Sequence, residues 1–121
     1  MKTRIEALGV TLDVPEGSEV TSDGSVFAPD GVEFAVYTEP SNIDVALRKE
    51  IIEGRSPVSL FGDLAQTADG WLIQFETEDG ELGFELGRRR PDRCVVFWGD
   101  RMREAAAREQ AIAIAQQSLL V

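Results

Sequence analysis

The chain of 121 residues contains no histidine and only one cysteine, Cys94. Without an imidazole there is no default general base near neutral pH, which excludes Ser-His-Asp and Cys-His nucleophile pairs. A lone cysteine cannot form an internal disulfide, and without a second soft ligand it excludes a structural zinc site. We therefore expect no catalytic residues, no metal and no cofactor.

Cys94 itself has two interpretations. Arg90 and Arg93 stand close to it in the sequence and would lower the pKa of its thiol, making it reactive. A single cysteine within the strand-like segment RCVVF more commonly serves as a small apolar filler, and we favour that role.

Long apolar runs and basic residues are also scarce. No stretch approaches the roughly 18 apolar residues that a membrane span needs. The opening MKTRIEALGVTLDVPEG lacks the apolar run of a signal peptide, so we expect a cytoplasmic protein. Lys and Arg number 12 against 22 Asp and Glu, a net charge of −10. This balance repels phosphate backbones, so we expect neither nucleic acid nor membrane as a partner.

The residues that are present indicate a single folded α+β domain covering residues 1–121. Alternating apolar residues predict strands over residues 8–14, 25–28 and 32–38. Residues 58–66 fit either a strand through 58–61 or a loop.

A short helix is predicted over residues 42–53. Ser41 or Asn42 can cap it, and Ile43, Leu47 and Ile51 recur every four residues to form an apolar stripe.

The segment DGWLIQFETEDGELGFELGRRR (residues 69–90) predicts a β-hairpin. If Asp79-Gly80 form a two-residue loop, Glu78 pairs with Glu81 and Phe75 with Phe84. One face then carries the apolar residues Trp71, Ile73, Phe75, Leu82, Phe84 and Leu86. The other face carries Leu72, Gln74, Glu76, Glu78, Glu81, Gly83, Glu85 and Gly87.

A third strand and a helix should follow the hairpin. If Arg90 pairs with Arg93, the strand RCVVFWG places Phe97 beside Leu86 and Val96 beside Gly87. The remaining DRMREAAAREQAIAIAQQSLLV predicts a helix of about 20 residues, capped by Asp100, that covers the apolar face of the sheet. Its apolar stripe would contain Met102, Ala105, Ile112, Ala115 and Leu119. The expected architecture is a twisted, mostly antiparallel sheet with a short middle helix and a long C-terminal helix packed on it.

Four glutamates on the predicted polar face are candidate partner-binding residues: Glu76, Glu78, Glu81 and Glu85. Glu78 and Glu81 would face each other across the hairpin, where like charges cost up to about 1 kcal/mol. A solvated sheet edge, a surface for a basic partner, and a metal or catalytic site are the open alternatives; the solvated edge is favoured.

The arginines Arg88, Arg89 and Arg90 are further partner-binding candidates, because a short basic turn can contact phosphate or an acidic peptide. The favoured alternative is a turn whose arginines balance nearby glutamates. An apolar strip of Leu72, Val96 and Trp98 on the same polar face requires either a second packed layer or a ligand. The helix over 42–53 is the favoured layer.

These elements resemble the PsbP-like fold. ADGWLIQFETEDGELGFELGRRR, followed by a strand and a final helix ending AQQSLL, is similar to the C-terminal half of small bacterial proteins with that fold. The matching positions are Asp69-Gly70-Trp71, Arg88-Arg89 and Ser118-Leu119, and LDVPEG (Leu12 to Gly17) is similar to the opening segment. The resemblance covers residues 8–120 loosely and 69–99 best. The fold also occurs in the photosystem II extrinsic protein and the small Ran-binding nuclear import factor.

The resemblance implies a function that is mostly non-enzymatic. Members of this fold are mainly binding or assembly factors, and related small domains act as chaperones or adaptors for secreted toxins. Several exported relatives carry two cysteines suited to a disulfide, where this chain has Phe97 and Gln116, which agrees with a cytoplasmic location.

We thus expect a cytoplasmic protein-binding or adaptor domain that is not an enzyme. A secretion-associated chaperone or a toxin-neutralising protein is the alternative within binding proteins. A small enzyme using carboxylates and arginine is the alternative from another class, and a small-molecule ligand is not excluded. A pocket that joins an arginine with two acids would favour the enzyme, and an exposed, convex acidic face would favour the binder.

Overall fold

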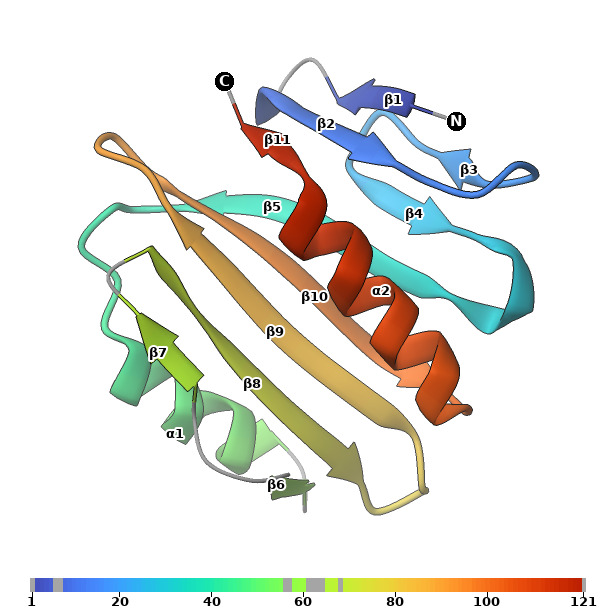
Figure 1. Ribbon diagram of the computed structural model, residues 1–121. Helices are drawn as coiled ribbons and strands as arrows, with labels where there is room; N and C mark the ends of the chain where they lie inside the picture. The colour runs from blue at the N-terminus through green and yellow to red at the C-terminus, as the bar shows by residue number, and fades with distance from the viewer. Residues whose placement is uncertain (1, 6–7, 56–57, 61–64, 68, 121) are drawn as a thin grey trace.

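The computed structural model describes residues 2–5, 8–55, 58–60, 65–67 and 69–120, which form an α+β fold (Figure 1). The described strands make two sheets, and all their pairings are antiparallel. The larger sheet has the order β3-β4-β5-β10-β9-β8-β6, and β7 also pairs with β8. Its strands are β3 (Glu19–Val20), β4 (Ser25–Phe27), β5 (Glu33–Glu39), β6 (Val58–Leu60), β7 (Ala65–Thr67), β8 (Gly70–Thr77), β9 (Leu82–Arg89) and β10 (Cys94–Met102).

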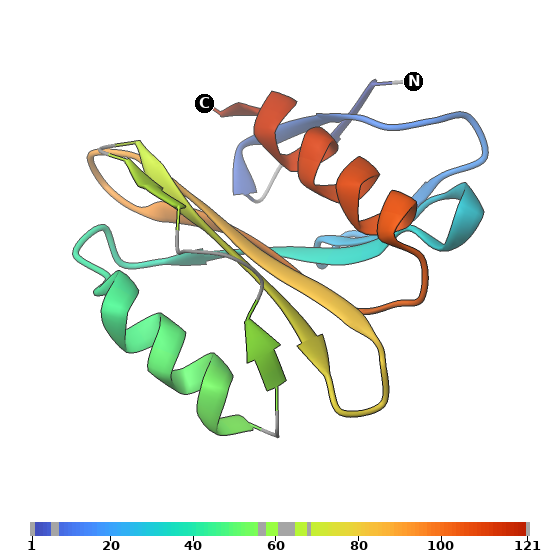
Figure 2. The ribbon, with the colours of Figure 1, turned by 60° about the horizontal axis from the view of Figure 1, so that its bottom comes forward.

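A smaller sheet, two α-helices and a short 3-10 helix, η2 (Pro29–Gly31), complete the described elements. The smaller sheet has the order β1-β2-β11, formed by β1 (Lys2–Ile5), β2 (Val10–Asp13) and β11 (Leu119–Leu120). The helix α2 (Ala105–Gln117) packs on β9, β10 and β2, whereas α1 (Val45–Arg55) lies on the opposite face of the larger sheet (Figure 2). The larger sheet is therefore a central layer with a helix on each side.

The main apolar core joins both sheets through α2. Val10, Leu12 and Val14 of the first predicted strand are buried in it, as are Val32, Phe34 and Val36 of the third, so the predicted inward faces of these strands are confirmed. A second apolar cluster lies beneath α1 on the other face of the sheet. Its buried members are Val45, Ile52, Trp71, Ile73, Phe75, Cys94 and Val96.

The register predicted for the β8–β9 hairpin is wrong by one residue. Its loop has three residues, not two, because the backbone N–H of Gly80 donates to Thr77 O (3.0 Å) and that of Thr77 donates to Glu81 O (2.8 Å). Gly80 adopts the left-handed conformation with φ 79°, the geometry of a tight turn followed by a glycine bulge. As a result Thr77, not Glu78, pairs with Glu81, and Phe75 lies opposite Gly83 instead of Phe84.

The shifted register places the predicted apolar face of β8 and that of β9 on opposite sides of the larger sheet. Trp71, Ile73 and Phe75 point towards α1, whereas Phe84 and Leu86 point towards α2. Gly83 lies opposite Phe75, and Gly87 opposite Trp71. A Cβ atom at Gly83 would lie 2.4 Å from the Phe75 ring, and one at Gly87 would lie 2.2 Å from the Trp71 ring. The two glycines make room for the aromatic rings, so this register is sterically specified.

The predicted β9–β10 register is confirmed. The backbone N–H of Arg90 donates to Arg93 O (2.7 Å), and the ladder pairs Phe97 with Leu86 and Val96 with Gly87. β8, β9 and β10 form the expected antiparallel meander.

The middle helix forms but presents a different face to the sheet. Asp44, not Ser41 or Asn42, caps α1, because its Oδ1 accepts the backbone N–H of Ala46 (3.0 Å). Val45 and Ile52 are buried, whereas Leu47 and Ile51 of the predicted stripe are 52% and 38% exposed. α1 is nevertheless the layer that was expected to cover the second face of the sheet.

The C-terminal helix covers the Phe84, Leu86 and Phe97 face as predicted but is shorter than predicted. β10 continues through Asp100 to Met102, so Asp100 is no cap and Glu104 is the N-cap residue. Leu119 belongs to β11 and is exposed. Among residues 58–66, β6 confirms the strand alternative over 58–60, and 61–64 lie outside the described residues.

Candidate functional site

A polar cluster lies beneath α1, around the carboxylate of Glu85. This side chain is completely buried, which corrects its predicted place on an exposed acidic face. Arg48 of α1 donates from Nε to both carboxylate oxygens (3.1 and 3.2 Å) and makes a further contact through Nη2. Trp71 Nε1 donates to the second oxygen (3.1 Å), and Arg48 Nη2 donates to Tyr37 Oη (2.8 Å). No sequence pattern pointed to this cluster, because Arg48 and Glu85 are 37 residues apart and belong to different elements.

The electrostatics of this cluster are those of a satisfied buried ion pair. The hydrogen bond to Glu85 raises the pKa of Arg48, and burial together with the Glu85 charge raises the pKa of Tyr37. A second carboxylate, Glu39, lies 4.0 Å from Arg48 Nη1. One arginine thus meets two acids, but the Arg48 side chain is only 12% exposed and Glu85 is not exposed at all. The cluster fastens α1 to the sheet and offers little surface to a substrate.

The other three glutamates do not share a common face. Glu76 pairs with Leu82 and lies on the α2 side of the sheet, Glu78 is exposed in the hairpin loop, and Glu81 is half-buried just before β9. Glu78 no longer faces Glu81, so the predicted repulsion between two paired glutamates is absent from this hairpin.

The three arginines after β9 also diverge. Arg88 reaches the end of α2, where its Nη1 donates to Ser118 Oγ (2.7 Å) and contacts Ser118 O. Arg89 lies on the opposite side, with its guanidinium 5.1 Å from the centre of the Trp71 ring. It also donates to the backbone oxygens of Ser41 and Ile43 (3.3 Å each), which ties down the segment before α1. Arg90 is exposed.

The predicted apolar strip is divided between the two faces. Val96 is buried beneath α1, and the Trp98 ring packs at 5.2 Å from the Phe75 ring. Leu72 lies on the α2 side and packs against the main core. Cys94 is completely buried, and burial raises the pKa of its thiol, which agrees with an apolar filler and disfavours a reactive cysteine.

A hollow of about 270 Å³, here called the sheet hollow, opens on the α1 side of the larger sheet. Figure 2 shows α1 beneath one half of that sheet, and the sheet hollow lies in the other half, over β4, β5 and the end of β10. Its lining residues are Ser25, Phe27, Glu33, Phe34, Ala35, Trp98, Gly99, Asp100 and Arg101.

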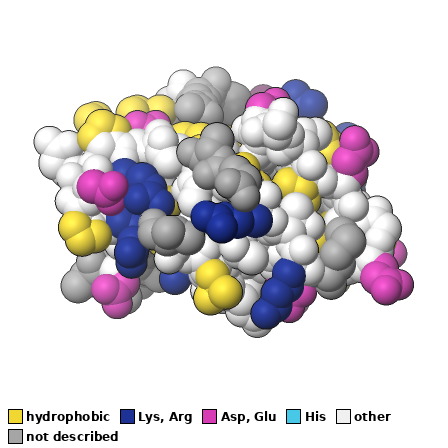
Figure 3. All heavy atoms as spheres, turned by 90° about the horizontal axis from the view of Figure 1, so that it is seen from above, with side chains coloured by type: hydrophobic (Ala, Val, Ile, Leu, Met, Phe, Trp, Pro, Cys, Tyr) yellow, Lys and Arg dark blue, Asp and Glu magenta, His cyan; other side chains and the backbone are white. Residues whose placement is uncertain are grey.

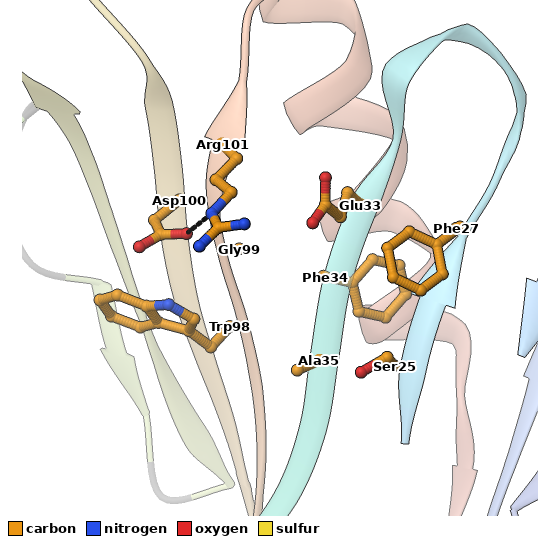
Figure 4. A pocket seen from close by; sticks show the side chains of 9 residues that line it. All are labelled: Ser25, Phe27, Glu33, Phe34, Ala35, Trp98, Gly99, Asp100 and Arg101. Atoms are coloured by element: carbon orange, nitrogen blue, oxygen red, sulfur yellow. Dashed lines mark ion pairs between the residues drawn. The ribbon is translucent and has the colours of Figure 1, made fainter. Parts of the chain in front are cut away.

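Figure 4 shows how these side chains surround the sheet hollow. Trp98 stands on one side and Phe27 on the other, with the short side chains of Ala35 and Ser25 between them. The end of the sheet hollow farthest from Ala35 and Ser25 is lined by Arg101 and Glu33. Arg101 Nε lies 4.0 Å from Asp100 Oδ1. Phe27 is 44% exposed, a large apolar surface for a strand residue.

Of the predicted site residues, only Trp98 lines the sheet hollow. Phe27, Glu33, Asp100 and Arg101 were missed. One signal was available: Phe27 follows the buried Val26, so alternation places an aromatic residue on the face where a polar one is expected.

Searches for related proteins gave no match, either to a family model or to a curated protein. The PsbP-like resemblance therefore stays a prediction. No helix in the described ranges is long and apolar enough to cross a membrane. Within the same ranges, no group of three or more metal-ligating side chains comes together.

Proposed function

We propose that this protein is a non-catalytic cytoplasmic binding or adaptor domain, and that a protein partner docks on the sheet hollow. The observation that supports this most directly is the exposed Phe27 facing Trp98 across a part of the sheet that α1 leaves uncovered. Aromatic residues around a small depression are typical anchors of protein interfaces.

The charges around the sheet hollow favour a segment that combines an apolar side chain with Lys or Arg. The apolar side chain would occupy the space between Phe27 and Trp98, while Glu33 and Asp100 would attract the basic residue. Arg101 offsets only one of these two acids. The net charge of −10 would accelerate the approach of such a basic segment.

The predicted acidic residues keep a role in this proposal. The ladder pairs Met102 with Leu82, so the end of β10 beside the sheet hollow lies next to the start of β9 and its acidic loop. Glu78 and Glu81 would therefore add to the attraction of a basic partner without contacting its apolar anchor.

Two observations support a binding role over catalysis. The chain has no histidine, and one cluster of an arginine with two nearby acids, Arg48 with Glu85 and Glu39, is packed beneath α1. A second such set, Arg101 with Asp100 and Glu33, lines the sheet hollow, but Arg101 is exposed and its Nε lies 4.0 Å from Asp100 Oδ1, a loose surface pair. Both groups of the Arg48–Glu85 pair already have hydrogen-bond partners.

Site-specific photo-crosslinking during affinity capture from the host lysate tests the proposal. A photoreactive phenylalanine at position 27 should crosslink one protein stoichiometrically, whereas the same group at Leu119, which is 60% exposed and distant in sequence, should not. Phe27→Ser should abolish capture, and Leu119→Ser should preserve it. Glu33→Lys combined with Asp100→Lys should weaken capture most at low salt.

Equal crosslinking from positions 27 and 119, or capture that survives Phe27→Ser, would contradict this docking surface. The identity of the captured protein then separates the adaptor from a chaperone or a toxin-neutralising protein, since the latter two would retain a secreted toxin.

A further inference from the structure

A second hollow of about 240 Å³, here called the helix-end hollow, lies where the last turn of α2 meets the start of β8 and the end of β9. It opens on the α2 side of the sheet and shares no lining residue with the sheet hollow. Its lining residues are Asp69, Gly70, Trp71, Leu72, Leu86, Gly87, Arg88 and Gln116. Leu72 and Arg88, which the sequence placed in two unrelated candidate sets, meet here.

The base of the helix-end hollow is apolar. Leu72 and Leu86 are direct cross-strand partners, so their side chains lie next to each other on the α2 side. Leu72 is only partly buried and leaves apolar surface facing the helix-end hollow. Beside this pair, Gly70 and Gly87 approach so closely that a Cβ atom at Gly70 would lie 1.9 Å from Gly87 O. The backbone of Gly87 occupies the place of a Cβ at Gly70, and the Trp71 ring occupies that at Gly87, so no other residue fits at either position.

The guanidinium of Arg88 borders this apolar base. Within the described part of the chain, only Nη1 of Arg88 donates a hydrogen bond, to Ser118, so Nε and Nη2 remain available as donors. Burial and, secondarily, the charge of Arg90 lower the pKa of Arg88, whereas the charge of Asp69 raises it. Figure 3 looks onto this end of the molecule and shows a cluster of Lys and Arg side chains on its left, with acidic side chains beside it. Among the described residues that line the helix-end hollow, Arg88 is the one cation and Asp69 the one carboxylate.

We propose that the helix-end hollow binds a small aliphatic monocarboxylate, with its tail on Leu72 and Leu86 and its carboxylate on Arg88. A guanidinium matches a carboxylate with two parallel hydrogen bonds, which Nε and Nη2 of Arg88 can donate. Asp69, which also lines the helix-end hollow, disfavours the greater negative charge of a phosphate group. The same chemistry occurs in a free aliphatic acid and in the C-terminal residue of a peptide that ends in leucine.

Titrations followed by ¹⁵N–¹H correlation spectra test this proposal and separate the two sources. The probes are octanoate, octan-1-ol, and a tripeptide ending in leucine with either a free or an amidated C-terminus. Octanoate or the free-acid peptide should shift the amide signals of Leu72, Gly87 and Arg88, and whichever binds more tightly identifies the source. The alcohol and the amidated peptide should bind at least tenfold more weakly.

Four variants separate a binding role of Arg88 from its contact with Ser118. Gln116→Trp places a large side chain at the rim of the helix-end hollow and leaves the hydrogen bond between Arg88 and Ser118 in place. This variant should abolish binding. Gln117→Trp is the matched control, since Gln117 is the next residue of α2 and does not line the helix-end hollow; it should bind like the wild type. Arg88→Gln should weaken binding at least tenfold, and Arg88→Lys should restore part of it.

The proposal is overturned if octanol binds as tightly as octanoate and the amidated peptide as tightly as the free acid, because the carboxylate would then play no part. It is also overturned if Gln116→Trp leaves binding unchanged, or if neither acid shifts the signals of the lining residues. Loss of this site would leave the docking proposal intact, because Phe27 and Trp98 lie in the other hollow.

Discussion

At the scale of single residues, Glu85 shows how one backbone turn determines the environment of a charge. The glycine bulge at Gly80 turns Glu85 towards α1, where burial of a lone carboxylate would be very costly. Arg48 and Trp71 supply the compensating hydrogen bonds. Such a pair contributes little net stability compared with apolar packing, but it strongly disfavours any arrangement that separates its members. It therefore fixes the position of α1 on the sheet.

Glu85→Gln removes the negative charge but keeps the shape of the side chain, leaving the Arg48 charge buried without its counterion. We expect the free energy of unfolding, measured by urea denaturation, to fall by about 3 kcal/mol. Glu81→Gln, four residues earlier in the sequence and outside the cluster, should change it by less than about 0.5 kcal/mol. Adding Arg48→Met to Glu85→Gln should recover part of the loss; equal effects of Glu85→Gln and Glu81→Gln would contradict the structural role of the pair.

Tyr37 makes the stability of this cluster depend on alkaline pH. Its pKa is raised above the ordinary value of 10.0, first by burial and then by Glu85, so the folded state disfavours the tyrosinate. The stabilisation is fully present below the unfolded pKa and is lost as the pH rises through the folded pKa. Tyr37 is the only tyrosine, so its ultraviolet absorbance titration should have a midpoint above about pH 10 in the folded protein and near about pH 10 in urea.

The matched measurement for this titration is the stability of Tyr37→Phe. Between about pH 9 and about pH 11 the wild type should lose more unfolding free energy than Tyr37→Phe. Equal losses would show that Tyr37 does not carry the dependence.

At the scale of elements, α1 illustrates why an apolar repeat can indicate the wrong face. Ile43, Leu47 and Ile51 repeat every four residues, yet the face that meets the sheet carries Val45, Arg48 and Ile52. From the apolar pattern alone, a charged residue such as Arg48 is expected to face the solvent. The buried carboxylate that it meets belongs to another element and has no trace in the pattern of this helix. The rotation of the helix about its axis is thus the one that buries Val45 and Ile52 and also brings Arg48 to Glu85.

Ile52→Ala should lower the unfolding free energy by about 2–4 kcal/mol, because it removes buried methyl groups and leaves a cavity beneath α1. Leu47→Ala, on the exposed stripe, should change it by less than about 0.5 kcal/mol. Urea denaturation of both variants measures the difference. The reverse order of effects would mean that the helix is rotated to its sequence-predicted face.

At the scale of the whole molecule, the acidic and basic groups lie at different ends of the larger sheet. The acidic loop joins β8 to β9, and the arginine-rich turn joins β9 to β10, so the eight residues of β9 separate them by about 25 Å. The sheet hollow lies beside the acidic end, and the helix-end hollow lies at the arginine-rich end. The two proposed ligands therefore differ in the sign of their charge.

The net charge of −10 should destabilise the compact state through self-repulsion. We expect the midpoint of thermal unfolding to rise when sodium chloride is added up to about 0.3 M, since exposed charges are screened over about 10 Å already at 0.1 M salt. Glu78→Lys should raise the midpoint at low salt and reduce the effect of salt, and Arg90→Glu should do the opposite. A midpoint that falls with salt would show that attractive surface pairs dominate.

Sequence patterns determined the parts of this protein that depend on neighbours along the chain. The α+β class, the inward faces of β2 and β5, and the β9–β10 register follow from alternation and from a two-residue turn, which act within a few residues. Tertiary structure decided the rest. Whether Glu78 belongs to a loop or a strand, which side of α1 is buried, and the meeting of Leu72 with Arg88 depend on contacts between distant segments. A bulge of one residue inverts a strand, and a buried charge finds its partner only after folding.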